Sequence, residues 1–404
     1  MNWLNFIWLI NNIYGKNEKP DLNKIQKMGL LAIKIGQVHA LRIDFLSEKK
    51  CQHLSKLYRK TININIEDSK LLIDSYSNTK FKRDIKNIDY KPIASASVGQ
   101  VHVAYLRGKK VAVKIIKGNF KKKFIKDVRS VKSLFKLIIF FYPKLARVAN
   151  PIGILKNIEE YTVAELNLLN EIKGHNILMN IYEKNKNSFN LKNLKFAKIY
   201  YEYSNENILV SEFIEGKTID ELLEEKKLPY NVLLELFHIH GFYMFCVGTF
   251  HGDIHPGNII ISEGKIYFID TGAIGRVSKR LRKGLFYFFK ELSDYNYDKC
   301  AYWLNEMASK KISSPEKFNS FKKQFNELYS DFKGKTVSEV SLTRKMMETI
   351  KLGVNNGMDF EEGMFSIIKS LMYMDGMVLR CNPDAILLKD MRKFIDEFER
   401  FISK

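Results

Sequence analysis

The chain has 404 residues, of which 46% are hydrophobic and 27% charged, a composition that excludes a disordered protein and allows a sizeable core. Its formal net charge of +21 favours anionic partners, although composition does not choose among nucleic acid, anionic lipid and anionic small molecules. The four cysteines form no Cys-x-x-Cys pair, which argues against a zinc knuckle or redox motif and favours a reduced, intracellular chain.

The N-terminal segment carries a short apolar run that includes Trp3 and Trp8. The run lacks the basic segment and cleavage site of a signal peptide. It is also shorter than the roughly 20 apolar residues that span a bilayer, and no other run is long and uncharged enough to do so. Two interpretations stay open: a segment at the membrane interface, which tryptophan favours, or a first helix packed on the body.

Helices are predicted over residues 21–60, where apolar residues recur at steps of three and four. Residues 61–88 are polar and rich in Asn and Lys, and they predict a connection with short helical pieces. Two β-type runs, 101–105 and 111–116, flank the turn residues 107–110 and predict a hairpin.

The second half of the chain is predicted to be mostly helical. Residues 120–185 are mainly helical, residues 207–214 form a strand candidate, and Thr218 is a candidate N-cap for the next helix. A His- and Asp-rich loop, a hairpin around Gly264 and further helices follow. A strand–turn–strand opening before a helical second half is typical of a protein-kinase-like α+β fold.

The segment from residue 250 to residue 272 carries the strongest chemical signal. Asp253 and Asn258 have the spacing of the kinase catalytic loop, His-Arg-Asp-x-x-x-x-Asn. Asp270, which precedes Thr271 and a glycine, has the position of the kinase Asp-Phe-Gly motif. Mg²⁺ prefers such hard oxygen ligands, and a carboxylate beside the transferred phosphoryl group orients or deprotonates the attacking hydroxyl.

A zinc site is the competing interpretation of the same loop. His251, Asp253 and His255 alternate along it, but no further ligand cluster in the sequence completes a zinc site.

Lys114 ends a Val-Ala-Val-Lys run that matches the third-strand lysine of kinases. An inward lysine on a strand is costly unless phosphate or carboxylate pairs with it, and ATP together with a helix glutamate would supply both. The loop before this hairpin is rich in small residues rather than glycine. Small residues still let backbone amides approach phosphate.

Several motifs together resemble the UbiB family of atypical kinase-like proteins over roughly residues 25 to 390. They are the Lys-x-Gly-Gln run from Lys34 to Gln37, the string 41–46, the Glu-Leu-Asn segment 165–171, the small-residue loop ending in Val-Gly-Gln-Val-His, and the His-Gly-Asp-Ile-His-Pro-Gly-Asn loop 251–258. The chain departs from the family pattern at Asn167, where the family has Asp, at Thr271 in place of Phe, and at Ile43 in place of Pro.

The resemblance implies a bilobal protein-kinase-like fold. We expect an N-terminal helical extension with the Lys-x-Gly-Gln motif over residues 1–88. We expect an N-lobe with a small sheet over 89–215 and a mostly helical C-lobe over 216–404.

The resemblance also assigns roles to individual residues. Lys114 pairs with Glu171 and contacts ATP phosphates, while Asp253 is the catalytic-loop acid. Asn258 and Asp270 hold Mg²⁺. The remaining expected site residues are those covering the nucleotide (Ala94, Ser95, Ala96, Ser97), those lining the adenine side (Glu212, Phe213, Ile214), and the regulatory pair on one helix face (Lys34, Gln37). A solvated helix face is the alternative for that last pair.

The expected function is that of an atypical kinase or ATPase that uses ATP and Mg²⁺ and supports quinone or isoprenoid-lipid biosynthesis. Expected partners are an isoprenoid or quinone-like lipid, an anionic membrane surface and other quinone-biosynthesis proteins, but not nucleic acid. The expected location is cytoplasmic, peripheral to the inner face of the membrane. An orthodox protein kinase, a non-catalytic ATP-gated lipid chaperone and an aminoglycoside-type phosphotransferase stay as alternatives.

Overall fold

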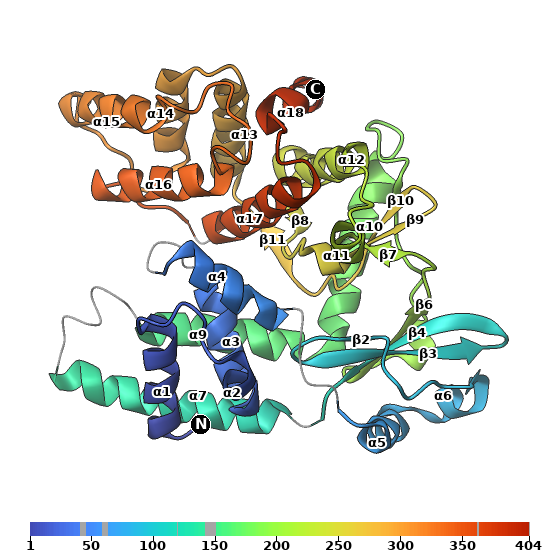
Figure 1. Cartoon of the computed structure of the whole chain (residues 1–404). Coiled ribbons are helices and arrows are strands. Elements are labelled where there is room, and N and C mark those ends of the chain that lie inside the picture. The colour runs from blue at the N-terminus through green and yellow to red at the C-terminus, as the bar shows by residue number, and fades with distance from the viewer. Residues whose placement is uncertain (41–45, 59–63, 119, 142–150, 362, 404) are drawn as a thin grey trace. The chain divides into compact units, whose positions relative to one another are not determined.

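The computed structural model describes the chain except for residues 41–45, 59–63, 119, 142–150, 362 and 404 (Figure 1). Its internal contacts divide the chain into two compact units. Unit 1 comprises Met1–Lys173 and Ala197–Phe213, and unit 2 comprises Gly174–Phe196 and Ile214–Lys404. The finer division at residues 88 and 215 stays a prediction.

Unit 1 opens with helices, as the 3.6-residue periodicity predicted. Gly29 has a φ of 103°, which interrupts the helical path between α2 and α3. The helices are α1 (Trp3–Tyr14), α2 (Leu22–Lys27), α3 (Leu30–His39), α4 (Glu48–Ser55), α5 (Ile66–Tyr76), α6 (Thr79–Asp84), α7 (Phe120–Phe141) and α9 (Pro151–Glu165). Helix α10 (Leu168–Asn185) contains the boundary between the units.

Residues 61–88 were expected to be a connection with short helical pieces. The described part of this stretch contains two helices, α5 and α6, which take up more of it than that prediction suggested. Asn65 and Asn78 are their N-caps, each accepting a hydrogen bond from a backbone N–H three residues on. Local capping by asparagine therefore outweighs the polar composition that suggested a connection.

A five-stranded antiparallel sheet completes unit 1. Its order is β1-β3-β4-β6, with β2 also paired to β3; the strands are β1 (Ile85–Lys86), β2 (Ala94–Ser95), β3 (Gly99–Leu106), β4 (Lys109–Ile116) and β6 (Ile208–Glu212). The predicted hairpin is confirmed, because Arg107 (φ 50°) and Gly108 (φ 80°) form the two-residue turn between β3 and β4.

The amphipathic helix α1 answers part of the question left open by its sequence. Phe6, Leu9 and Ile13 are buried in a core that α1 shares with α3 and α7 (Figure 1). Trp3 and Leu4, on the other hand, are 59% and 58% exposed. The helix therefore packs on the body of unit 1 and also presents apolar side chains to solvent.

Unit 2 contains two small sheets. The first has the order β5-β10-β9-β7 and the second pairs β11 with β8; the strands are β5 (Leu194–Lys195), β7 (Lys217–Thr218), β8 (Thr249–His251), β9 (Ile259–Ser262), β10 (Lys265–Phe268) and β11 (Ile274–Arg276). Thr218 caps the following helix with a reciprocal bond to Glu221, as the sequence predicted.

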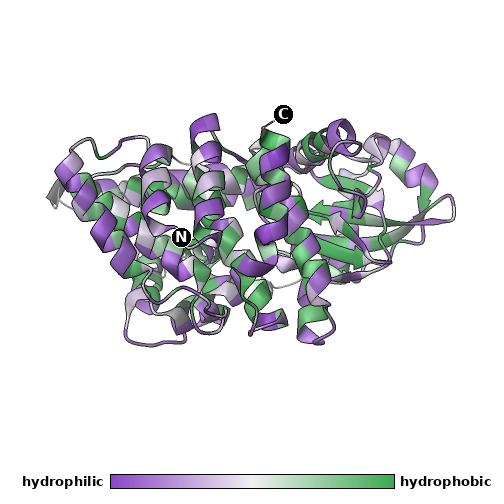
Figure 2. Ribbon diagram, turned by 90° about the horizontal axis from the view of Figure 1, so that it is seen from above, coloured by the Kyte–Doolittle hydropathy of each residue, from purple (hydrophilic) through white to green (hydrophobic). Residues whose placement is uncertain are grey.

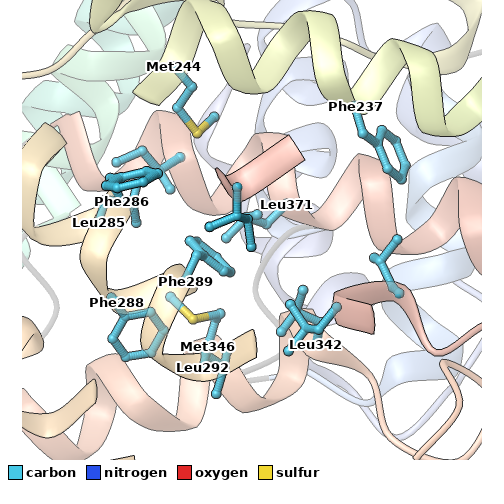
Figure 3. Close-up of a cluster of buried hydrophobic side chains, with 14 of the residues drawn as sticks. Phe237, Met244, Leu285, Phe286, Phe288, Phe289, Leu292, Leu342, Met346 and Leu371 are labelled. Carbon is cyan, nitrogen blue, oxygen red and sulfur yellow. The ribbon is translucent and has the colours of Figure 1, made fainter. Parts of the chain in front are cut away.

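Helices make up most of the rest of unit 2. They are α11 (Ile219–Glu224), α12 (Tyr230–Gly241), α13 (Lys279–Ser293), α14 (Tyr297–Met307), α15 (Pro315–Leu328), α16 (Leu342–Asn355), α17 (Gly363–Cys381) and α18 (Leu387–Ile402). Hydrophobic and hydrophilic residues alternate around the helices (Figure 2), as expected where one face is buried. Phenylalanine, leucine and methionine side chains from α12, α13, α16 and α17 fill the core between them (Figure 3).

The α+β, protein-kinase-like fold class is confirmed: a small sheet with helices in unit 1 and a mostly helical unit 2. Among the described helices, none combines the length and apolarity needed to cross a bilayer.

His240, on α12, is the basis of a stability prediction. It is 1% exposed, and neither ring nitrogen has a hydrogen-bond partner among the described residues. Burial, helped by the neighbouring His251, lowers the pKa of His240 to about 3. Between pH 6.5 and pH 3 the unfolded chain therefore binds a proton that the folded chain does not, and the free energy of unfolding falls as the pH falls.

We expect His240→Leu to raise the free energy of unfolding by about 1 kcal/mol at pH 7, because it removes unsatisfied buried polar atoms. The gain should grow as the pH is lowered from 7 to 5. Urea unfolding of both proteins at several pH values measures it. A variant less stable than the wild type, or a gain independent of pH, would contradict the assignment of a buried neutral imidazole.

Candidate active site

Strand β8 leads into the predicted catalytic loop, and His251 at its end ties that loop to a second segment. The backbone N–H of Asp253 donates to His251 Nδ1 (3.1 Å), so Nε2 carries the ring hydrogen and donates to the carbonyl of Ile269 (3.0 Å). Burial holds the pKa of His251 below its ordinary value, which keeps the ring neutral. His251 is therefore a fixed bridge between the loop and the residue preceding Asp270.

The register of the β9–β10 hairpin brings the two predicted metal ligands together. Ile259, the first residue of β9, pairs with Phe268, the last residue of β10. Asn258 directly precedes Ile259, and Ile269 directly follows Phe268. The Ile269 N–H donates to the Asn258 carbonyl (3.0 Å). Asp270 comes next. The two-residue turn between β9 and β10 therefore places Asn258 and Asp270 together at the opposite, open end of the hairpin.

The side-chain oxygen atoms of Asn258 and Asp270 are suitable ligands for Mg²⁺. Asn258 Nδ2 donates to the Asp253 backbone carbonyl (3.1 Å), which leaves the amide oxygen as the atom that can face a cation. Asp270 adds a carboxylate. An amide oxygen and a carboxylate are the hard ligands that Mg²⁺ prefers, alongside phosphate and water.

The carboxylate of Asp253 lies beside a lysine that sequence reasoning did not single out. Lys369 Nζ on α17 is 3.0 Å from Asp253 Oδ1. Burial opposes ionisation of Asp253, but Lys369, His255 and His251 together hold its pKa below the ordinary value. The loop acid is therefore an anion at neutral pH.

Gly174 on α10 explains how closely this helix approaches the Asp270 segment. A Cβ at Gly174 would lie 1.8 Å from the carbonyl oxygen of Thr271 and 2.9 Å from its carbon. No side-chain rotation relieves a clash with backbone. Glycine is therefore required at this position if Asp270 and Thr271 are to keep their conformation.

We expect Gly174→Ala to lower the free energy of unfolding by about 2 kcal/mol and to reduce Mg²⁺-dependent nucleotide binding, since the overpacked backbone must shift. The matched control is Gly376→Ala on α17, where an added Cβ meets nothing within 4 Å. That control should be neutral or stabilising by up to about 1 kcal/mol. Urea unfolding and nucleotide titration test both, and equal behaviour of the two variants would contradict the close approach.

In unit 1, Lys114 and Glu171 form the predicted pair. Lys114 lies on β4 and Glu171 on α10, and Nζ is 2.6 Å from Oε2. Their side chains are 15% and 12% exposed, so each charge is mostly shielded from water and lies beside its counter-charge. The pairing agrees with the expectation, while its part in phosphate binding stays a prediction.

The small-residue loop is tied to the sheet by a buried lysine. Ala94 and Ser95 form β2, and the Ala96 N–H donates to the carbonyl of Gly99 (2.8 Å). Lys117 is 2% exposed and donates from Nζ to the Ala96 carbonyl (2.7 Å). Burial lowers the pKa of Lys117 to about 8. Ser97 is half-buried in the same turn.

The three residues predicted to line the adenine side fall at the boundary of the units. Glu212 ends β6, and its N–H donates to the Lys198 carbonyl (2.8 Å). The ring of Phe213 lies beneath Lys110 Nζ, 3.8 Å from the ring centroid. Ile214 is the first residue of the second segment of unit 2.

The Lys-x-Gly-Gln motif lies on α3 and is largely buried. Lys34 forms an ion pair with Glu165, and Gln37 donates from Nε2 to the Leu57 carbonyl (3.0 Å). Gln37 is 5% exposed and the Lys34 side chain 11% exposed, so the alternative of a solvated helix face is wrong. An added Cβ at Gly36 would lie 2.5 Å from a Leu57 methyl carbon, which accounts for the glycine between them.

The string 41–46, including Ile43, which resembles the family's Arg-Pro-Asp string, lies outside the described residues except for Leu46.

The alternative of a zinc site in the loop 251–258 gains no support. Across the described part of the chain, no three His, Cys, Asp or Glu side chains gather in a way that could hold a metal ion.

The ABC1 atypical kinase-like domain model matches residues 56–304, more than half of the chain. The chain belongs to the ABC1 atypical kinase-like family. The match covers the candidate site residues from Lys114 to Asp270, and it ends before α17 and Lys369.

Relatives of this ABC1 atypical kinase-like chain extend the similarity over most of its length. A protein named "Probable protein kinase UbiB" from Pseudomonas fluorescens (strain SBW25) is 25% identical over 389 residues, covering 93% of this chain and 70% of that protein. A protein of the same name from Providencia stuartii is 25% identical over 406 residues, covering 97% of this chain and 72% of that protein. The resemblance to the UbiB family is confirmed.

Among solved structures, the Rv3197–erythromycin complex from Mycobacterium tuberculosis superposes with a TM-score of 0.57 at 18% identity, covering 84% of each chain. This likeness supports the fold of the ABC1 atypical kinase-like chain. Erythromycin is the ligand named for that protein.

Proposed function

We propose that the chain is an atypical kinase or ATPase that binds ATP with Mg²⁺. The observation that carries the proposal is the convergence, within unit 2, of Asn258 and Asp270 at one end of the β9–β10 hairpin, beside the loop that holds Asp253. A loop acid beside two oxygen ligands for Mg²⁺ is the arrangement that phosphoryl transfer requires.

The proposed roles follow from the chemistry of each side chain. Asn258 and Asp270 hold Mg²⁺, which when bound neutralises charge on the phosphates. Asp253 orients the acceptor hydroxyl or water and takes its proton. Lys114, kept charged by Glu171, contacts phosphate oxygens.

Two backbone segments of the chain complete the proposed nucleotide contacts. The loop Ala94–Ser97 is proposed to approach phosphate through backbone amides other than that of Ala96, which bonds to Gly99, and Lys117 holds that loop through the Ala96 carbonyl. Glu212, Phe213 and Ile214 are proposed to contact the adenine through their backbone.

The Lys-x-Gly-Gln helix favours a small-molecule or lipid substrate over a protein substrate. Lys34 and Gln37 are fixed by Glu165 and the Leu57 carbonyl rather than exposed for peptide binding. We propose that both residues regulate turnover, and that Lys34→Ala changes its rate without removing nucleotide binding.

Quinone or isoprenoid-lipid biosynthesis at a membrane is the proposed setting, supported by the relatives named UbiB. Unit 1 also has a surface suited to anionic lipid. Trp3, Leu4 and Ile7 are exposed on α1, and α1 packs against α7, which begins with exposed lysines at 121–123. Apolar side chains and adjacent basic residues bind membranes better together than either does alone.

ATP hydrolysis by the whole chain tests the proposal, measured with and without anionic liposomes and with phenolic, quinone-like ligands. We expect Mg²⁺-dependent hydrolysis that rises with liposomes or ligand. Robust phosphorylation of peptides would instead indicate an orthodox protein kinase. Nucleotide binding with no turnover under any condition would indicate a non-catalytic lipid chaperone.

A further inference from the structure

Lys369 is the cation that faces the loop acid from outside the kinase motifs. Its Nζ is 3.0 Å from Asp253 Oδ1, close enough for an ion pair but without the angles of a hydrogen bond. Oδ1 is completely shielded from solvent, whereas the Asp253 side chain as a whole is 26% exposed. The exposed area of this side chain therefore belongs to its atoms other than Oδ1.

The position of Lys369 follows from how α17 is anchored at both of its ends. At the N-terminal end, an added Cβ on Gly363 would be 3.0 Å from the Arg276 carbonyl oxygen. The start of α17 therefore packs closely against β11. At the C-terminal end, Arg380 pairs with Asp220 (2.8 Å). Strand β11 pairs in turn with β8, which runs directly into the loop of Asp253.

The residues around Lys369 also face this loop. Tyr373 lies one turn further along α17, and its ring packs edge-on against His255 at 5.3 Å between centroids. Lys369 Nζ lies 5.8 Å from the Tyr373 ring centroid. One face of α17 therefore contacts the loop 251–258 through two neighbouring side chains, Lys369 and Tyr373.

We propose that Lys369 is a positioning residue for Asp253: its ammonium holds Oδ1 and so turns the second carboxylate oxygen toward the phosphoryl acceptor. This inference rests on the proposed function. In the step concerned, the acceptor oxygen forms a bond to the γ-phosphorus, the bond from that phosphorus to the ADP oxygen breaks, and the acceptor proton passes to Asp253.

The physical reason is the cost of leaving a shielded oxygen of a carboxylate without a counter-charge. Without Lys369, Oδ1 would be a buried anionic atom with no partner, and the carboxylate would rotate toward other donors. General-base catalysis depends on hydrogen-bond reach to the acceptor, so a rotated carboxylate loses rate while nucleotide binding is unaffected.

Steady-state kinetics of ATP turnover by the whole chain test the inference with Lys369→Met, Lys369→Arg and the control Lys345→Met. Lys345 is a lysine of unit 2 with a similarly shielded side chain, paired with Asp331 at 2.8 Å. We expect Lys369→Met to lower kcat at least about 10-fold with KM for ATP within about 3-fold of the wild type. Lys369→Arg should recover much of kcat, and Lys345→Met should change neither constant.

A double-variant cycle separates positioning from a structural role. In an Asp253→Asn background, Lys369→Met should cause no further loss of kcat, because Lys369 acts through Asp253. Losses that multiply, or an unchanged kcat in Lys369→Met, would overturn the inference while leaving ATP turnover by the wild type intact. No turnover by the wild type would overturn the proposed function and this inference together. If Lys369→Met fails to fold, two other comparisons test the inference. One is the kcat of the conservative variant Lys369→Arg, and the other is the effect of Lys369→Gln on kcat in the wild-type and Asp253→Asn backgrounds.

Discussion

Asp270→Asn is expected to lower Mg²⁺-dependent ATP turnover by at least about 100-fold, the effect of removing one key charged contact to a transition state. Asp270 has a φ of 51°, in the left-handed region that asparagine tolerates as well as aspartate does. The substitution therefore removes the negative charge without straining the backbone. Phosphate release at saturating ATP over a range of Mg²⁺ concentrations measures it.

The matched control is Glu263→Gln in the same hairpin. Glu263 is exposed in the β9–β10 turn with a φ of 48°, so the control also removes one negative charge at a left-handed position. It should leave turnover within about 2-fold of the wild type. Equal losses in both variants, or full activity in Asp270→Asn, would contradict the role of Asp270 as a metal ligand.

Breaking the Lys114–Glu171 pair should have the second large effect, on stability as well as activity. Removing one member, as in Glu171→Leu, leaves the other charge mostly buried and should cost about 3 kcal/mol of the free energy of unfolding. The same variant should also lose ATP affinity, because the Lys114 ammonium, which is proposed to contact phosphate, loses its Glu171 counter-charge. Urea unfolding and nucleotide titration measure the two losses.

The double variant Lys114→Met with Glu171→Leu distinguishes the two contributions. Replacing a buried pair by apolar residues of similar size is close to neutral, so stability should return to near the wild-type value. ATP binding should not return, since the Lys114 ammonium that is proposed to contact phosphate is absent from β4. Recovery of both properties would show that the pair is only structural.

The motif residues of unit 2 could be predicted from the sequence because their placement depends on local geometry. The turn at Gly264 fixes the register of the β9–β10 hairpin, and that register brings Asp270 back to Asn258. The β3–β4 hairpin was predictable for the same reason, from the turn residues 107–110. Turn chemistry and strand register act over a few residues, where sequence patterns are informative.

Contacts made by tertiary packing could not be predicted in this way. Lys369 occupies an ordinary position on a helix, and only the seating of α17 on β11 brings it to Asp253. Gly174 gave a weak signal, a glycine inside a predicted helix, which did not reveal its contact with Thr271. Where α5 lies, the polar composition predicted only short helical pieces in a connection, although Asn65 is a good N-cap.

Calorimetric titration of ATP into the whole chain, with Mg²⁺ and with Mg²⁺ removed by chelation, tests the proposed nucleotide site most directly. We predict saturable binding of one ATP in Mg²⁺, at least about 10-fold weaker binding without it, and comparable weakening in Mg²⁺ for Lys114→Met and Asp270→Asn. Absence of ATP binding by the wild type, or wild-type affinity in both variants, would contradict the assignment of Lys114, Asn258 and Asp270 to a nucleotide's phosphates and their metal ion.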